Sequence, residues 1–231
     1  MSLKYIENNI IISSEGGQVM MEWEKPYMVS SIDALHPTDD VLEIGFGLGY
    51  SATQIMTYNP KSYTIIECNS IVINKAKEWA KNYPSISITI VEGKWQDCLA
   101  HLGIFDQIYF DDYPLDIIKH SSFKERVCSY TRINLFIGLC IQNHTRIGSK
   151  ISWYLNGNPK KMILGADTMP FITLETTPFP IHIPETCKYR NIKDHQCTIP
   201  LLTKIKKYDF NEAQSLALKQ IETDRSKIKF L

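Results

Sequence analysis

The chain has 231 residues, of which 44% are hydrophobic and 22% charged, and this length and composition suit one globular α/β core. Lys+Arg and Asp+Glu each number 25, so no net charge would attract a polyanion, and bulk nucleic acid is not an expected partner. No apolar run approaches the ~18 residues that a membrane-spanning helix needs, and the first residues lack the apolar stretch of a signal peptide. We therefore expect a soluble, cytoplasmic protein with a single domain and no membrane partner.

The cysteines are scattered and form no CxxC pair, in contrast to a zinc site or a disulfide framework. They are Cys68, Cys98, Cys128, Cys140, Cys187 and Cys197. The one hint of a ligand cluster is His195 beside Cys197, close in sequence to Cys187. We expect reduced thiols and no metal site.

Residues 39–110 alternate short β-branched runs with helical patterns, which is typical of βαβ units and a parallel sheet. The expected strands lie at 41–44, 63–66, 86–91 and 104–110, and a helix is expected at 51–58. A second helix follows a cap at Asn69 or Ser70 and ends before Pro84. Its apolar residues fall at helical spacing, so Trp79 is more often a core residue than a site residue.

The second half of the chain predicts a helix at 121–143, a fifth strand at 150–155 and a loop at 156–159. Late antiparallel strands are expected at 171–176 and 198–205. A last helix begins at about Asn211 with a capping-box pattern, and it would cap the core or pair with another subunit. We divide the domain into an N-terminal helical cap (1–37), a Rossmann-like core (38–205) and a C-terminal helical extension (206–231).

Glycines at 45, 47 and 49 stand between the first expected strand and its helix, where the backbone can approach a ligand closely. Tyr50 occupies the place of the third glycine of a dinucleotide fingerprint, so that spacing fails. S-adenosylmethionine carries a carboxylate instead of a pyrophosphate and tolerates the looser loop. Glu67 ends the second strand, where an acid can accept hydrogen bonds from both ribose hydroxyls.

Several sequence blocks, taken together, carry a resemblance to a known family. VMMEWEKPYM at 19–28 is similar to the block VMERWETPYM, and IIECN at 65–69 is identical to a block, of the guanidinoacetate N-methyltransferases. The protein-arginine delta-N-methyltransferases share the look of MMxWE, EGxWQD and IYFDxY. The blocks lie between about residues 18 and 205, at Val19–Met28, Val41–Gly47, Ile65–Asn69, Gly93–Asp97, Phe105–Leu115, Cys187–Tyr189 and Pro200–Lys204.

The resemblance implies a Rossmann-like class I methyltransferase fold, in which helices flank a mainly parallel, seven-stranded sheet with antiparallel late strands. It also implies S-adenosyl-L-methionine as the cofactor and S-adenosyl-L-homocysteine as the product, with no metal. The implied cofactor-binding residues are Met20, Met28, Glu43, Gly45, Phe46, Gly47, Leu48, Gly49, Tyr50, Ser51, Glu67, Cys68, Asn69, Trp95 and Gln96.

The resemblance further implies that Asp111, Glu24 and Tyr113 bind the guanidine of the substrate. A guanidinium has a pKa of about 12.5 to 13.8 and delocalised lone pairs, so it is a poor nucleophile. Its positive charge is also repelled by that of a sulfonium. Two carboxylates would offset that repulsion and hold the fork of N–H donors. Asp111 would then accept the proton of the attacking nitrogen late in the methyl transfer, and Glu24 would chiefly anchor the guanidinium. No role is implied for Asp112, where the family has threonine.

Departures from the family cluster on the acceptor side of the chain. RIGS at 146–149 replaces a KPGG turn, LNG at 155–157 replaces a Leu-Thr-Ser type stretch, and the region from 156 to 187 is shorter. The expected partner is a small guanidine such as guanidinoacetate or arginine, bound by a monomer or homodimer. Three alternatives stay open: a protein-arginine (delta-N) methyltransferase, a catalytically silent S-adenosylmethionine-binding module, and a nucleic-acid amino-methyltransferase, whose Pro-Pro-aromatic loop is only loosely matched here.

Overall fold

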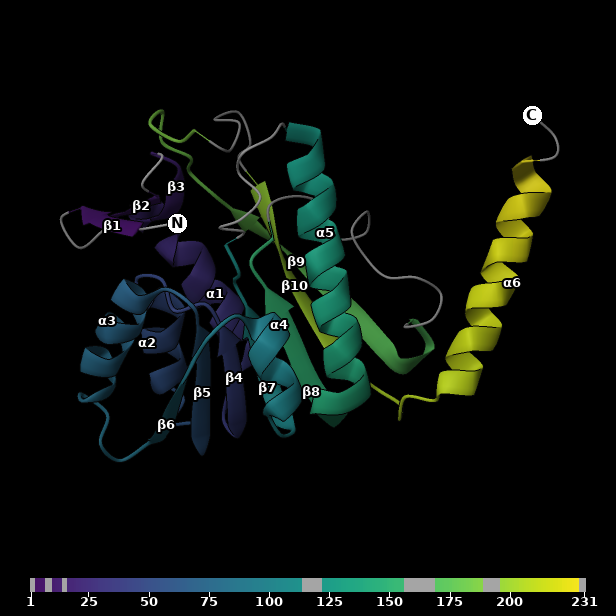
Figure 1. The fold of residues 1–231 in the computed structure, drawn as a ribbon, viewed down its shortest axis with the longest axis horizontal. Helices are drawn as coiled ribbons and strands as arrows, with labels where there is room; N and C mark the ends of the chain where they lie inside the picture. The colour runs from purple at the N-terminus through teal and green to yellow at the C-terminus, as the bar shows by residue number, and fades with distance from the viewer. Residues whose placement is uncertain are drawn as a thin grey trace.

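The computed structural model describes residues 3–6, 10–13, 16–113, 122–155, 169–188 and 196–228. Within them, seven strands form one sheet in the order β6-β5-β4-β7-β8-β10-β9 (Figure 1). Strands β4 to β8 pair in parallel, and β10 pairs antiparallel with both β8 and β9. The expected mainly parallel sheet with antiparallel late strands is confirmed. The bounds are β4 (Asp40–Ile44), β5 (Ser62–Glu67), β6 (Ser87–Glu92), β7 (Phe105–Phe110), β8 (Thr145–Trp153), β9 (Ile172–Pro180) and β10 (Gln196–Lys204).

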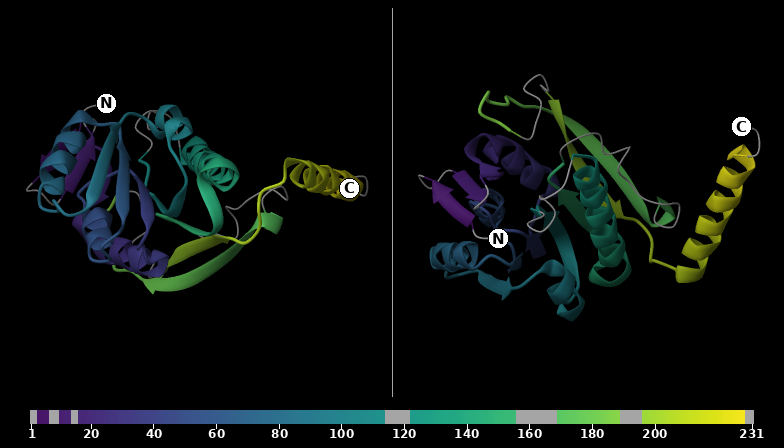
Figure 2. Two further views of the ribbon diagram at one scale, coloured as in Figure 1. Left: turned by 90° about the horizontal axis from the view of Figure 1, so that it is seen from below. Right: turned by 45° about the horizontal axis from the view of Figure 1, so that its top comes forward.

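Helices cover both faces of the sheet (Figures 1 and 2), because neighbouring residues of the central strands alternate between two hydrophobic clusters. Ile65 and Tyr109 pack with α1, α2 and α3, whereas Ile66 and Ile108 pack with α4 and α5. The helices on these faces are α1 (Lys25–Leu35), α2 (Tyr50–Met56), α3 (Ser70–Ala80), α4 (Trp95–Cys98) and α5 (Ser122–Leu139), which continues as a π-helical turn (Cys140–His144). Trp79 packs against Phe46 and Tyr83, in line with a core role.

The expectation of a helical cap over residues 1–37 is wrong for its first part. Strands β1 (Leu3–Ile6), β2 (Ile10–Ser13) and β3 (Gln18–Met21) form a small antiparallel sheet, and only a 3₁₀ turn (Glu22–Glu24) and α1 follow as helix. The isoleucine run at 10–12 favours an extended chain because β-branched side chains lose rotamer freedom in a helix. In β2, buried and partly exposed residues alternate, as expected for a strand with one covered face.

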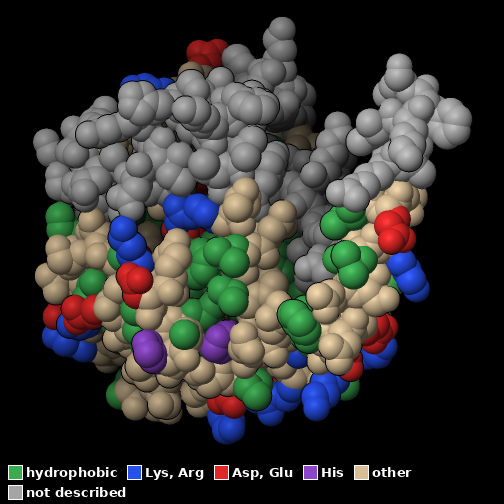
Figure 3. Space-filling model, turned by 45° about the vertical axis from the view of Figure 1, so that its right-hand side comes forward, with side chains coloured by type: hydrophobic (Ala, Val, Ile, Leu, Met, Phe, Trp, Pro, Cys, Tyr) green, Lys and Arg blue, Asp and Glu red, His purple; other side chains and the backbone are tan. Residues whose placement is uncertain are grey.

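Of the two roles expected for the C-terminal helix α6 (Phe210–Ile228), the structure does not show the capping of the core. The helix extends away from the sheet in all three views (Figures 1 and 2), and among its described side chains only Ala213 is buried. Hydrophobic side chains stand exposed on this side of the molecule (Figure 3). The exposed large hydrophobic residues include Leu135 on α5 and Phe210, Leu218 and Ile221 on α6. No helix among the described residues is long and apolar enough to cross a membrane. The loop expected at 156–159 and the side chain of His195 lie outside the described residues.

Candidate active site

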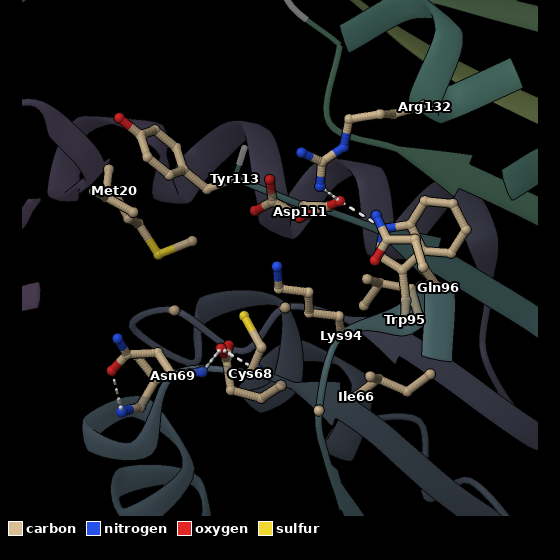
Figure 4. A pocket seen from close by; sticks show the side chains of 18 of the residues that line it. Met20, Ile66, Cys68, Asn69, Lys94, Trp95, Gln96, Asp111, Tyr113 and Arg132 are labelled. Atoms are coloured by element: carbon tan, nitrogen blue, oxygen red, sulfur yellow. Dashed lines mark hydrogen bonds and ion pairs between the residues drawn. The ribbon is translucent and has the colours of Figure 1, made fainter. Parts of the chain in front are cut away.

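A cavity of about 650 Å³ opens at the carboxyl ends of β4, β5 and β7, the edge where parallel α/β sheets bind ligands. Figure 4 shows the side chains of Met20, Lys94 and Asp111 pointing into this shared space. Ten of the expected site residues line the cavity: Met20, Gly45, Gly47, Glu67, Cys68, Asn69, Trp95, Gln96, Asp111 and Tyr113. Eight others are not part of its lining: Glu24, Met28, Glu43, Phe46, Leu48, Gly49, Tyr50 and Ser51.

Gly45 brings the backbone of the glycine loop into direct contact with the backbone of Asp111. Its N–H donates to the carbonyl oxygen of Ile66 at 2.9 Å, and the N–H of Asp111 donates to that of Ile44 at 2.9 Å. Gly45 has a φ of +83°, and a Cβ at this position would lie 2.2 Å from the carbonyl oxygen of Asp111. Only glycine allows this backbone approach, which fixes where Asp111 stands relative to β4.

Replacing Gly45 with alanine is expected to destabilise the fold and displace Asp111. The left-handed conformation alone costs a non-glycine residue about 1–3 kcal/mol, and the contact with the backbone of Asp111 adds to it. Urea unfolding measures the loss. Gly103→Ala is the matched control, because its Cβ would meet no heavy atom within 4 Å. Equal unfolding midpoints for the two variants would contradict the assigned constraint.

Met20 lies over the other end of the glycine loop. A Cβ on Gly47 would stand 2.5 Å from its Sδ and Cε atoms, and the N–H of Leu48 points to the Sδ atom at 3.0 Å. Phe46 is buried and packs against Gly49 and Trp79, so it belongs to the core behind the loop. Met20 thus forms one wall of the cavity and comes from β3, a strand that lies outside the main sheet.

Glu43 is fully buried behind the cavity wall. Its carboxyl group accepts hydrogen bonds from the hydroxyls of Ser51 and Tyr63, which tie β4 to α2 and β5. Burial raises the pKa of Glu43 well above its ordinary value, and the charges of Asp111 and Glu67 raise it further. Glu43 and Ser51 therefore connect β4 to α2 behind the glycine loop instead of facing the cavity. Met28, on α1, also lies in the hydrophobic core and does not face the cavity.

Glu67 stands at the end of β5 with its carboxylate held by three backbone N–H groups. One oxygen accepts from Phe46 at 3.0 Å, and the other accepts from Cys68 and Asn69 at 2.8 Å each. Asn69 in turn caps α3 through its side-chain oxygen, which accepts from the N–H groups of Ile71 and Val72. A carboxylate has about four acceptor positions, so Glu67 keeps capacity for a ligand hydroxyl in the cavity.

Asp111 follows β7 and faces a second acid. Desolvation in the cavity raises the pKa of Asp111 to about 8, and the nearby charges of Glu24, Asp112 and Glu67 act in the same direction. Glu24 is 5% exposed, and its Oε2 atom accepts from the N–H of Met21 at 2.8 Å, which holds it at the start of α1. These acids make the cavity a favourable place for a cation.

Four charged residues at the cavity were not assigned any role from the sequence: Lys94, Asp97, Asp112 and Arg132. Asp112 accepts hydrogen bonds from the Trp95 indole at 2.6 Å and from the Arg132 guanidinium. Lys94 directly precedes α4 and points its ammonium into the cavity (Figure 4). Arg132 lies on α5, distant in sequence from every motif, so no spacing could have indicated it. The available signals were the adjacency of Lys94 to Trp95 and of Asp112 to Asp111.

The model of the guanidinoacetate N-methyltransferase family matches residues 2–133. Among curated relatives, protein arginine N-methyltransferase 2 from Candida glabrata is 38% identical over 123 residues, or 48% of this chain and 29% of that protein. The protein of the same name from Saccharomyces cerevisiae is 32% identical over 124 residues, with the same coverage of 48% and 29%. The matched part of the chain spans less than a third of the length of these relatives.

Solved methyltransferases share the fold at low sequence identity. An O-methyltransferase from Bacillus cereus in complex with SAH has a TM-score of 0.52 at 10% identity, over 78% of this chain and 80% of that one. The N-methyltransferase NodS from Bradyrhizobium japonicum has a TM-score of 0.51 at 13% identity, over 80% and 97%. The fold is therefore that of class I methyltransferases. Because the family model covers more than half of the sequence, the chain belongs to the guanidinoacetate N-methyltransferase family.

Proposed function

We propose that this protein transfers a methyl group from S-adenosylmethionine to a nitrogen of a guanidino group. The observation that carries the proposal is the position of Asp111, which lies in the cavity at the carboxyl edge of the sheet with Glu24 as its electrostatic neighbour. Two acids at this edge suit a planar cation that presents a fork of N–H donors. The family match supports the same class of acceptor.

The residues at the cavity fit the proposed cofactor. A volume of about 650 Å³ lies within the range of small-molecule sites, and Glu67 offers a carboxylate suited to ribose hydroxyls. Met20 and the backbone at Gly45 and Gly47 would border its amino-acid part, and Trp95 and Gln96 its adenine. When bound, the cofactor supplies a methyl group made electrophilic by a sulfonium.

Asp111 and Glu24 would perform the chemistry that the chain itself contributes. Their carboxylates would hold the guanidinium in one orientation and offset its charge, which binding beside a sulfonium otherwise opposes. As the attacking nitrogen becomes more acidic, an oxygen of Asp111 would accept its proton. Glu24, whose Oε2 is already bonded to the backbone of Met21, would anchor without moving.

The acceptor itself is tested by a panel of guanidines. We propose a small guanidine, such as guanidinoacetate or free arginine, with arginine in a protein as the second candidate because the curated relatives are protein arginine N-methyltransferases. Transfer of labelled methyl groups to guanidinoacetate, arginine, arginine-containing peptides and protein extracts separates the two. Transfer to none of them, with cofactor bound, would sink the proposed function and favour a silent binding module.

The pH dependence of turnover follows from the raised pKa of Asp111. In the free protein, kcat/KM is expected to rise with pH up to a limb near 8, because Asp111 must be ionised to accept a proton. A bound guanidinium favours the carboxylate, so the limb of kcat should lie at lower pH. Steady-state profiles with the best acceptor of the panel measure both limbs. A kcat/KM that is flat from pH 6 to about 9 would contradict the role of Asp111 as the proton acceptor.

A further inference from the structure

Asp112 connects three elements at the wall of the cavity. It lies in the turn after β7, next to Asp111, and its Oδ2 atom accepts from the Trp95 indole of α4 and from the Arg132 guanidinium of α5. All three side chains are largely buried: Trp95 is 3% exposed, and the side chains of Arg132 and Asp112 are 21% and 14% exposed. Trp95 also packs edge-on against Phe110 and Phe136, so the donor to Asp112 is itself fixed by the core.

Asp111 and Asp112 are neighbours in sequence but interact with opposite layers of the fold. Asp111 interacts electrostatically with Glu24 and Tyr27, which belong to the layer of α1. Asp112 bonds to α4 and α5 on the other face. Because the two residues share one stretch of backbone, holding the side chain of Asp112 on one face would also restrain the backbone that presents the side chain of Asp111 on the other.

We propose that Asp112, held by Trp95 and neutralised by Arg132, is a positioning residue that fixes Asp111 in the cavity and keeps its electrostatic surroundings constant. The proposal rests on the proposed function, since it assigns Asp111 the reacting role. Arg132 is needed because Asp112 would otherwise add an uncompensated charge beside a site that already holds several acids. Three residues, from α4, from the turn after β7 and from α5, thus act as one unit.

The charge of this unit matters because Asp111 stands among many ionisable groups. Acids face it from the 3₁₀ turn, β4, β5 and its own turn, bases line the same cavity, and two buried tyrosines lie on the α1 side. These groups are Glu24, Glu43, Glu67 and Asp112; Lys94 and Arg132; and Tyr27 and Tyr109. Asp112 already raises the pKa of Asp111, so a change in how far Arg132 compensates the charge of Asp112 should change that pKa.

Substitutions in the two partners are expected to shift the titration of Asp111 in opposite directions. Asp112→Asn removes a like charge and leaves Arg132 uncompensated, so the pKa of Asp111 should fall by about 1 unit. Arg132→Gln leaves the charge of Asp112 uncompensated, so the pKa should rise by about as much. In the variant that carries both substitutions, the pKa of Asp111 should be close to that in the unchanged chain. Arg132→Lys keeps the charge and should restore the titration, although it lacks the planar fork.

Carboxyl ¹³C NMR titration of the full chain measures these shifts, with the Asp111 signal assigned by its loss in Asp111→Asn. Lys61→Met is the control, since Lys61 is exposed and pairs with Asp40 at the start of β4, the end of the strand opposite the cavity. If Asp112 and Arg132 had a purely structural role, the pKa of Asp111 would shift in the same direction in both single variants or would equal that of the control in both. Either result would overturn the proposal. If Asp112→Asn does not fold, Arg132→Gln against Arg132→Lys carries the same test. The titration needs no acceptor, so a failure of methyl transfer would count against the proposed function alone.

Discussion

Asp111→Asn is expected to lower turnover on the accepted guanidine by about 10²–10⁴-fold, the usual contribution of a positioned general base. An asparagine has the same shape and keeps the backbone contact with Gly45, but it cannot accept the proton that the attacking nitrogen must lose. Because Asp111 lies at the acceptor end and the cofactor residues stand around Glu67, the affinity for S-adenosylhomocysteine should stay close to that of the unchanged chain.

The measurement combines steady-state turnover with calorimetric binding of S-adenosylhomocysteine. Asp39→Asn serves as a matched control, because this exposed acid precedes β4 and lies at the opposite edge of the sheet. Glu24→Gln should raise KM more than it lowers kcat, since Glu24 anchors the acceptor. Near-normal turnover of Asp111→Asn would remove Asp111 from the reaction and leave the two acids as a binding site for a cation.

The sheet and the position of Asp111 could be predicted from the sequence because each depends on local pattern. The β-branched runs at 41–44 and 63–66 alternate with helical spacing, and β4 and β5 form there. Parallel strands place their carboxyl ends at one edge, so the glycine loop, Glu67 and Asp111 had to come together. Family blocks added Glu24, which no local pattern distinguishes from a solvated helix residue.

The remaining features depend on contacts between distant segments, which no local pattern records. Met20 reaches the glycine loop from a strand of a separate sheet, and Arg132 reaches Asp112 across the fold from α5. Glu43 lies on β4, the strand that leads into the glycine loop. The alternation of side chains along this strand points Glu43 away from the cavity, towards Ser51 and Tyr63. The capping-box pattern at about Asn211 indicated the start of α6 correctly, but a local pattern could not say what covers that helix.

Glu67→Gln is expected to weaken binding of S-adenosylhomocysteine by about 10- to 100-fold, which corresponds to the roughly 1–3 kcal/mol lost when a buried hydrogen-bonding group loses its partner. The carboxylate accepts from Phe46, Cys68 and Asn69 on both oxygens. An amide has one acceptor oxygen and one NH₂ group, so at least one N–H would face a donor. The loops after β4 and β5 would then separate where the ribose is proposed to bind.

Calorimetric titration with S-adenosylhomocysteine and urea unfolding together separate a ligand contact from a loop anchor. Glu92→Gln is the matched control, because Glu92 pairs in register with Glu67 on the adjacent strand but is exposed and bound to Lys77. Lower affinity with a small change in stability would support direct contact with the ligand. Unchanged affinity with a large loss of stability would mean that Glu67 serves the fold alone, and the proposed cofactor position would then depend on Trp95 and the glycine loop.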